Sequence, residues 1–148
     1  MKINSTILSI LSAVIVCMAS ISCSAKNVVI KVQDLPQQAQ SFLDTHFKTS
    51  EISLVVKDGN EYDIRFENGW EVEFNHKGQW EKIDCKRDSV PSSVISILPE
   101  AIPSYLRSNY ENAFITEIGL DHSGYDVELS NGLDIEFSSN GRFKIIDD

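Results

Sequence analysis

The chain has 148 residues, of which 42% are hydrophobic, and a formal net charge of −9 at pH 7. This length suits one compact domain or two very small ones. The acidic balance argues against nucleic acid as a partner and against adhesion to anionic lipid surfaces, because both depend on Lys and Arg. A basic partner or cations remain compatible with the charge.

The first 25 residues have the composition of a secretory signal peptide. Lys2 is their only charged residue, an apolar stretch broken by serines spans residues 7–21, and small residues follow up to Ala25. The stretch is too short and too rich in serine to suit a membrane span. We predict a signal peptide over residues 1–25 and a mature chain from Lys26, without a membrane span, in a periplasmic or secreted location. An uncleaved N-terminal anchor is the alternative.

Cys23 offers a second mode of processing, as the lipidated first residue of a bacterial lipoprotein. Cleavage after Ala25 is favoured, because lipid signals normally carry an aliphatic residue three positions before the cysteine, where this chain has Ser20. Outside the leader, Cys85 is the only cysteine. It cannot form an internal disulfide, so the fold is expected to depend on its hydrophobic core.

The chain aligns with itself without a gap when it is shifted by 63 positions. The identical pairs fall where turns and core residues are expected, and include Leu35-Pro36 on Leu98-Pro99, Tyr62-Asp63 on Tyr125-Asp126, Asn68-Gly69 on Asn131-Gly132, and Glu73-Phe74 on Glu136-Phe137. Such self-similarity is the signature of repeated units. We therefore predict one repeat over residues 26–88 and a second over residues 89–148.

Each repeat is predicted to open with a helix. Apolar residues recur at helical spacing at Leu35, Ala39, Phe42, Leu43 and Phe47, and again at Leu98, Ile102, Tyr105, Leu106 and Tyr110. Pro36 and Pro99 suit the first helical position, where a missing N–H costs nothing. Pro103 would break a hydrogen bond in a helix that begins at Pro99, so the second helix is expected to begin late or to kink. Residues 89–97 are expected to add a helical turn.

Four strands are predicted to follow each helix. In the first repeat, the apolar residues that alternate with polar ones are Ile52, Leu54 and Val56, then Tyr62, Ile64 and Phe66, then Trp70, Val72 and Phe74. Alternation of period two indicates one buried and one solvated face. The Asn-Gly pairs at 68–69 and 131–132 predict type I′ hairpin turns, because Asn and Gly tolerate positive φ.

The predicted fold is α+β, with two tandem repeats, each a helix packed on a four-stranded antiparallel meander sheet. A unit of about 60 residues buries too little surface to be comfortably stable alone. The repeats are therefore expected to pack together or to extend one sheet into the next.

The recurring motifs have a counterpart among known proteins. Leu-Pro, Phe/Tyr-Leu, Tyr-Asp, Asn-Gly, Glu-Phe and Gly-x-Trp/Phe occur twice across residues 35–148. This pattern resembles the PepSY-like family of exported Bacteroidetes proteins, also described as beta-lactamase-inhibitor-like. The resemblance implies a fold shared with a secreted protein inhibitor whose sheet grips its target. It carries over no catalytic or binding residue, because a shared fold does not by itself transfer function.

No catalytic or metal-binding motif is recognised. His46, His76 and His122 lack metal-ligand spacing, and the chain has no CxxC, no GxSxG and no phosphate-binding loop. Cys85 and His76 would meet as nucleophile and base only across a hairpin, with no third group to orient them. We therefore predict that the protein is not an enzyme and has no cofactor or metal site.

The candidate partner-binding residues lie mostly on the polar face of the predicted sheets. They are Asp63, Arg65, Glu71 and Glu73 in the first repeat, Asp126, Glu128, Asp134 and Glu136 in the second, and Trp80, which follows a turn near a sheet end. Neighbouring strands place such side chains about 5 Å apart. This polar face is a solvated surface, a docking surface for a basic partner or a calcium site. A flat sheet does not suit calcium well, because it does not bring the required oxygen ligands together around one point. For Trp80, a place in the core is favoured over a partner-binding role.

The sequence therefore predicts an exported, non-catalytic binding module. Its partner is an unknown protein or peptide, for example an exported enzyme that it inhibits, bound through the polar sheet face or the hairpin tips. The alternatives are an accessory or structural lipoprotein tethered through Cys23, and an enzyme with an unrecognised site.

Overall fold

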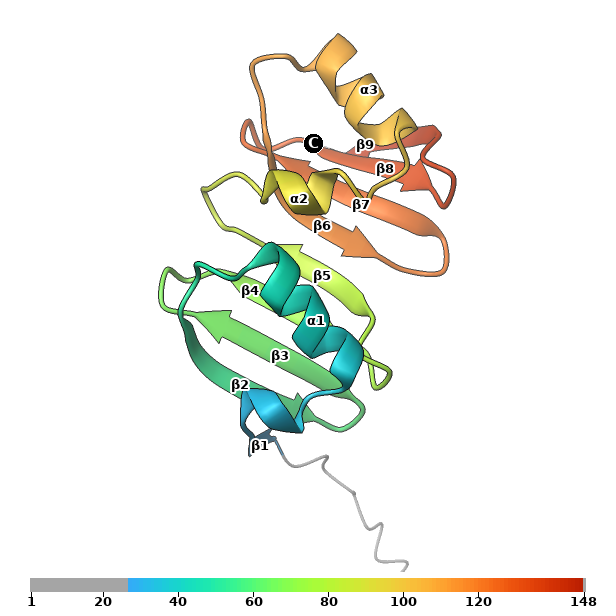
Figure 1. The fold of residues 1–148 in the computed structure, drawn as a ribbon. Helices are drawn as coiled ribbons and strands as arrows, with labels where there is room; N and C mark the ends of the chain where they lie inside the picture. The colour runs from blue at the N-terminus through green and yellow to red at the C-terminus, as the bar shows by residue number, and fades with distance from the viewer. Residues whose placement is uncertain (1–26, 148) are drawn as a thin grey trace, which may run out of the picture.

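The structure is a computed structural model that describes residues 27–147. Its strands form one nine-stranded antiparallel sheet, in which every strand lies beside its neighbours in sequence (Figure 1). The predicted leader, including Cys23, lies outside the described residues. Within residues 27–147, no helix has both the length and the apolar character needed to cross a membrane.

The strands are β1 (Val28–Val29), β2 (Ile52–Asp58), β3 (Glu61–Phe66), β4 (Glu71–Phe74), β5 (Trp80–Asp84), β6 (Ile115–Leu120), β7 (Gly124–Leu129), β8 (Asp134–Ser138) and β9 (Phe143–Asp147). The helices are the short 3-10 helix η1 (Val32–Asp34), α1 (Gln37–His46), α2 (Ser92–Ile95) and α3 (Ala101–Asn109). Strands β6 to β9 each begin 63 residues after β2 to β5, respectively. An antiparallel sheet with a few helices is the α+β class predicted from the sequence.

The α-helices all lie on one face of the sheet. Helix α1 covers the sheet of β2–β5, α3 covers that of β6–β9, and α2 lies near the junction between β5 and β6 (Figure 1). The two longer helices, α1 and α3, pack on the sheet through aromatic contacts. The rings of Phe42 and Phe74 meet edge to face at 5.7 Å, and those of Tyr105 and Phe137 do so at 5.6 Å.

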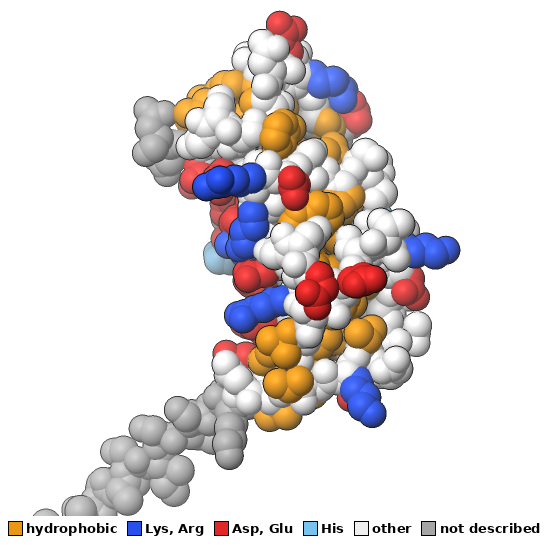
Figure 2. Space-filling view, turned by 90° about the vertical axis from the view of Figure 1, so that its left-hand side faces the viewer, with side chains coloured by type: hydrophobic (Ala, Val, Ile, Leu, Met, Phe, Trp, Pro, Cys, Tyr) orange, Lys and Arg blue, Asp and Glu red, His pale blue; other side chains and the backbone are white. Residues whose placement is uncertain are grey.

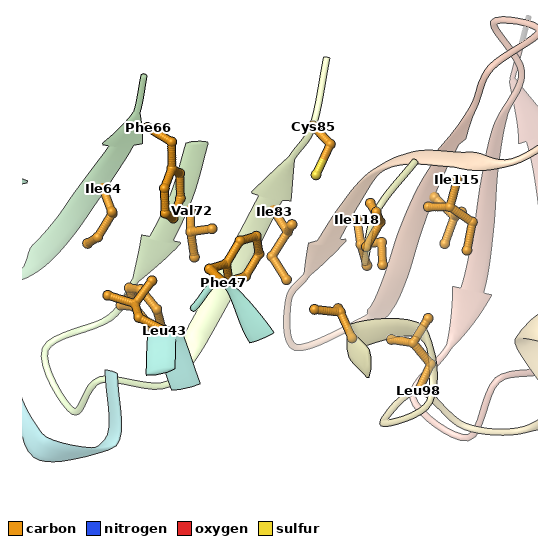
Figure 3. Packing of buried hydrophobic residues seen from close by; sticks show 14 of the residues in the cluster. Leu43, Phe47, Ile64, Phe66, Val72, Ile83, Cys85, Leu98, Ile115 and Ile118 are labelled. Carbon is orange, nitrogen blue, oxygen red and sulfur yellow. The ribbon is translucent and has the colours of Figure 1, made fainter. Parts of the chain in front are cut away.

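One row of fully buried aliphatic side chains crosses the sheet from β3 to β8 beneath the helices. Cross-strand pairing connects, in order, Ile64, Val72, Ile83, Ile118, Val127 and Ile135. Figure 3 shows the first four of these residues on neighbouring strands. Because Ile83 of β5 pairs with Ile118 of β6, the core continues from one half into the other. Of the two arrangements expected, the structure therefore has the extended sheet.

Strand β2 departs from the predicted alternation. Its pairing with β3 shifts between Ile52 and Leu54, as in a β-bulge. One extra residue reverses the faces of all that follow. Val55 therefore enters the core, with 4% of its surface exposed, while Leu54 and Val56 pair with Arg65 and Asp63 on the opposite face.

The prediction of type I′ turns is wrong. A type I′ turn needs positive φ at both central residues. In the Asn68-Gly69 pair, Gly69 has a positive φ of 86°, but Asn68 does not. The N–H of Gly69 donates to the Phe66 carbonyl, and the N–H of Phe66 donates to the Trp70 carbonyl, which defines a three-residue loop. The Asn68 side chain accepts a hydrogen bond from the Trp70 N–H at 3.1 Å instead of adopting positive φ. The loop at residues 130–132 has the same backbone bonds.

Both longer helices begin after the proline that was assigned to their first position. Pro36 precedes α1 as its N-cap residue, and α3 begins at Ala101, two residues beyond Pro99. Pro103 is thus the third residue of α3, where a backbone N–H has no acceptor within the helix and none is lost. This confirms the late start that was one of the two expectations for Pro103. Helix α2 provides the helical turn expected within residues 89–97.

Candidate functional site

The face of the sheet opposite the helices, called the open face below, carries two rows of mostly charged side chains. Register places Asp63, Glu73, Lys82, Gly119, Asp126 and Glu136 in one row across strands β3 to β8. The second row contains Arg65, Glu71, Asp84, Glu117, Glu128 and Asp134. The structure therefore brings all of the predicted charged candidates onto one surface. Figure 2 shows charged side chains gathered along its left margin, where this face is seen edge-on.

Sequence reasoning missed the middle of this surface. Lys82 and Asp84 flank the buried Ile83, and Glu117 precedes the buried Ile118, so alternation around these core residues was the available signal. These residues join the two halves. The Lys82 ammonium lies 2.7 Å from the Glu117 carboxylate across the β5–β6 junction. The charged surface is consequently continuous instead of being two separate patches.

Trp80 does not share the open face. Its ring stacks on Phe42 of α1 with 6.3 Å between ring centroids, and lies 6.5 Å from the ring of Tyr125. Trp80 is half-buried and packs against the core on the helix side of the sheet. The structure thus separates it from the carboxylates with which it was grouped.

On the open face, several acids stand directly opposite other acids. Asp63 pairs with Glu73, Asp126 with Glu136, and Glu128 with both Glu117 and Asp134. Like charges at such positions destabilise a sheet. The neighbouring cations relieve part of this repulsion, through ion pairs between Arg65 and Glu71 at 3.8 Å, Lys86 and Glu71 at 3.5 Å, and Lys144 and Glu136 at 3.4 Å.

This crowding changes proton affinities. Partial burial, followed by the nearby Asp63 charge, raises the pKa of Glu73 above its usual value. Partial burial also raises the pKa of Asp63, Asp126 and Glu128, with further contributions from Glu136 to Asp126 and from Glu117 to Glu128. The pKa of Lys82 is raised as well, because its hydrogen bond to Glu117 favours the charged ammonium.

The substitution Glu73→Gln is expected to stabilise the protein at neutral pH, by less than about 1 kcal/mol. A carboxyl group with a raised pKa binds its proton more tightly in the folded state than in the unfolded chain. Its ionisation therefore destabilises the fold above that pKa, and the penalty vanishes as the pH falls through it. Urea unfolding at neutral and mildly acidic pH should show an advantage of the variant that shrinks on acidification.

Glu71→Gln is the matched control, because Glu71 contacts Arg65 and Lys86 and loses both ion pairs when neutralised. It is expected not to stabilise the protein. A Glu73→Gln variant that is less stable than the wild type at neutral pH would contradict the repulsion described above.

The groups considered for catalysis are not assembled. Cys85 follows β5 and His76 lies in the turn before it, so the two stand at opposite ends of the strand. Burial raises the pKa of the Cys85 thiol to about 12, and the protonated thiol is a poor nucleophile. Among residues 27–147, no group of three or more His, Cys, Asp or Glu side chains is arranged to hold a metal ion.

Comparison with known proteins gives concordant matches. A family model described as "Putative beta-lactamase-inhibitor-like, PepSY-like" matches residues 20–72 and 60–145. A solved structure from Bacteroides vulgatus ATCC 8482, described as a "putative periplasmic protein", is 35% identical, with a TM-score of 0.77 over 83% of this chain and 98% of its own. A second protein from that strain is 36% identical, with a TM-score of 0.75 over 83% of this chain and 100% of its own.

A third solved structure comes from Bacteroides thetaiotaomicron and is described as a calcium-regulated periplasmic protein. It is 36% identical, with a TM-score of 0.77 over 82% of this chain and 97% of its own. No curated protein matches the chain. The match of the family model to most of the sequence, together with these relatives, shows that the chain belongs to the PepSY-like, beta-lactamase-inhibitor-like family.

Proposed function

We propose that this protein is an exported, non-catalytic binding protein whose open face docks a basic protein or peptide. The observation that carries the proposal is the open face itself, where acids oppose acids on neighbouring strands and no described helix covers them. Ionised carboxylates held in this arrangement repel one another, and a ligand that supplies Lys or Arg relieves the repulsion. The beta-lactamase-inhibitor-like description of the family favours a protein, such as an exported enzyme, as the target.

The proposal is tested by comparing baits that differ only in where charge is removed. The test bait carries Glu71→Gln and Glu73→Gln, while the control bait carries Asp44→Asn and Glu111→Gln, which neutralise two exposed acids away from the open face. Periplasmic extract is passed over each immobilised protein. A partner retained by the wild type and the control, and lost from the test bait, supports the proposal.

With the purified partner, the association rate should fall on the order of tenfold for the test variant, and the wild-type affinity should fall as salt rises. If the test variant binds a verified partner like the wild type and salt has no effect, the open face serves only solubility. The hairpin tips at residues 68–69 and 76–77 would then be the better candidates.

Calcium forms a separate arm of this experiment, because one relative is described as calcium-regulated. Calcium chloride and sodium chloride are compared at matched ionic strength. Equal weakening by both salts supports docking through screened charges. A larger effect of calcium would identify the open-face carboxylates as cation ligands.

Export is part of the proposal. The leader over residues 1–25 motivates it, and the periplasmic description of the relatives supports it. We expect N-terminal sequencing of the native protein from a periplasmic fraction to begin at Lys26. A lipid-modified Cys23, detected by mass spectrometry of the membrane fraction, would support the tethered accessory lipoprotein instead. A retained Met1 or a cytosolic pool would contradict export.

We further infer that residues 26–88 and 89–148 are two copies of one helix-plus-four-strand unit. The constant spacing of the strand starts supports this, and so do two glycines in matching turns. Gly78 lies against Pro36 and Ala39 near the start of α1, and Gly141 lies against Pro99 and the start of α3. An experimental structure in which the backbones of the two halves do not superpose would refute the inference.

A further inference from the structure

Among residues 27–147, no strand lies beside the outer side of the β9 backbone. Strand β9 is the last strand of the sheet and lies at the edge opposite β1, at the top of Figure 1. Besides Lys144, this strand exposes large apolar side chains. The exposed fractions are 43% for Phe143, 48% for Ile145 and 36% for Ile146. Unpaired N–H and C=O groups beside exposed apolar residues form a template for a further strand.

The other half of the molecule shows what such a strand looks like when it is paired. Strand β5 pairs with β4 through Val72–Ile83 and Glu73–Lys82, and β9 pairs with β8 through Ile135–Ile146 and Glu136–Ile145. On its other side, β5 pairs with the antiparallel strand β6. The outer edge of β9 therefore corresponds to the edge of β5 that pairs with β6. At this edge, Ile145 of β9 takes the position that Lys82 has in β5.

The far edge of the sheet and the charge of the chain help to identify the occupant. The edge opposite β9 is β1, which has only two residues and pairs with Val56 and Lys57 of β2, so it offers a second copy little backbone for strand pairing. Pairing two copies through β9 would bring together open faces that carry Asp134 and Glu136 close to this edge. Repulsion between these acids disfavours self-association and favours a cationic strand.

We propose that β9 is the docking edge for an extended segment of the basic partner, which adds to the sheet as a tenth, antiparallel strand. This assignment rests on the proposed function of the open face. Apolar side chains of the segment would pack beside Ile146 on the helix side of the sheet. Its Lys or Arg side chains would lie over Ile145 on the open face and reach toward Glu136, roughly 10 Å away across two strand spacings. There they would join Lys144 of β9, which contacts the same carboxylate at 3.4 Å.

The test uses a synthetic peptide in which lysine alternates with valine, added to the full mature protein. A matched peptide has the same side chains but N-methyl groups on alternate backbone amides, which prevents strand pairing and preserves charge. We expect the unmodified peptide to protect amide hydrogens of β9 from exchange and to bind at least about tenfold more tightly than its N-methylated counterpart.

Two lysine substitutions provide matched protein variants. Ile145→Lys gives β9 a lysine at the position that corresponds to Lys82 of β5. A charged side chain on an edge strand disfavours the addition of another strand, so the affinity for the peptide should fall on the order of tenfold. Val29→Lys introduces the same charge on the other edge, where Val29 is 69% exposed, and should leave binding unchanged.

The outcomes separate this inference from the open-face proposal. If binding is salt-dependent and weakened by the Glu71→Gln and Glu73→Gln pair, yet insensitive to N-methylation and to Ile145→Lys, the edge assignment is overturned and the open face stands. Absence of exchange protection in β9 overturns the edge assignment even if the open face retains a partner from extract. A wild-type dimer that Ile145→Lys dissociates in sedimentation experiments would assign the edge to a second copy instead.

Discussion

Replacing Phe74 or Phe137 by alanine is expected to lower the free energy of unfolding by about 3–5 kcal/mol in each case. Neither ring has exposed surface. Phe74 packs edge to face against Phe42 of α1, and Phe137 does so against Tyr105 of α3. Truncation leaves a cavity between sheet and helix, and close packing prevents the surroundings from filling it completely. Equilibrium urea unfolding of the two variants measures the loss.

Phe143→Ala is the matched control, because Phe143 lies on the edge strand and is 43% exposed, although its ring stacks on Tyr105 at 5.0 Å. Its expected loss is about 1 kcal/mol. Since the buried row crosses the β5–β6 junction, Phe74→Ala and Phe137→Ala should both shift one cooperative transition. A loss below about 1 kcal/mol for either would show that its ring is not part of the core.

Gly78→Ala is expected to lower the free energy of unfolding by about 2–5 kcal/mol. Gly78 has a φ of 81°, a left-handed conformation that costs other residues about 1–2 kcal/mol. The added methyl carbon would also lie 2.8 Å from Cβ of Pro36 and 2.9 Å from the backbone nitrogen of Ala39. Because a helix backbone does not yield easily, this overpacking adds about 1–3 kcal/mol. Urea unfolding again provides the measurement.

Gly69→Ala separates the two contributions. Gly69 has a similar φ of 86°, but a methyl group there would meet nothing within 4 Å. Its expected loss is therefore the conformational part alone, about 1–2 kcal/mol. Equal losses for Gly69→Ala and Gly78→Ala would mean that the turn at residues 75–78 does not press on the start of α1.

Much of the candidate site could be predicted from alternation alone. Val72 and Phe74 point into the core while Glu71 and Glu73 point away, because the pleat of a strand turns successive side chains to opposite faces. Lys82 was missed although it obeys the same rule. Its strand begins with Trp80, and an irregularity where Trp80 pairs with Phe74 interrupts the period that the sequence displays.

Irregular backbone accounts for the other differences. The shift within β2 moves Val55 into the core and turns Leu54 out, an exchange that depends on one extra residue and leaves no mark in composition. Asn68 likewise has the right identity for a type I′ turn. Its side chain instead accepts a hydrogen bond from the Trp70 N–H. Asn68 therefore lies in a three-residue loop in which Gly69 alone has the left-handed backbone conformation. Both outcomes depend on the opposite strand as well as on the local sequence.

By itself, the sequence determined the α+β class, the family and the identity of the charged candidates, because these follow from composition, periodicity and motifs along the chain. Only the tertiary structure decided that β5 joins β6 in one continuous sheet, that Trp80 faces the helices, and that β9 is an edge strand in the part of the chain that the structure describes. Periodicity states which face of a strand is apolar, but it does not name the strand's neighbour. Which strands pair depends on contacts between segments that are distant in sequence, because one arrangement must bury the core and also cover the strand edges.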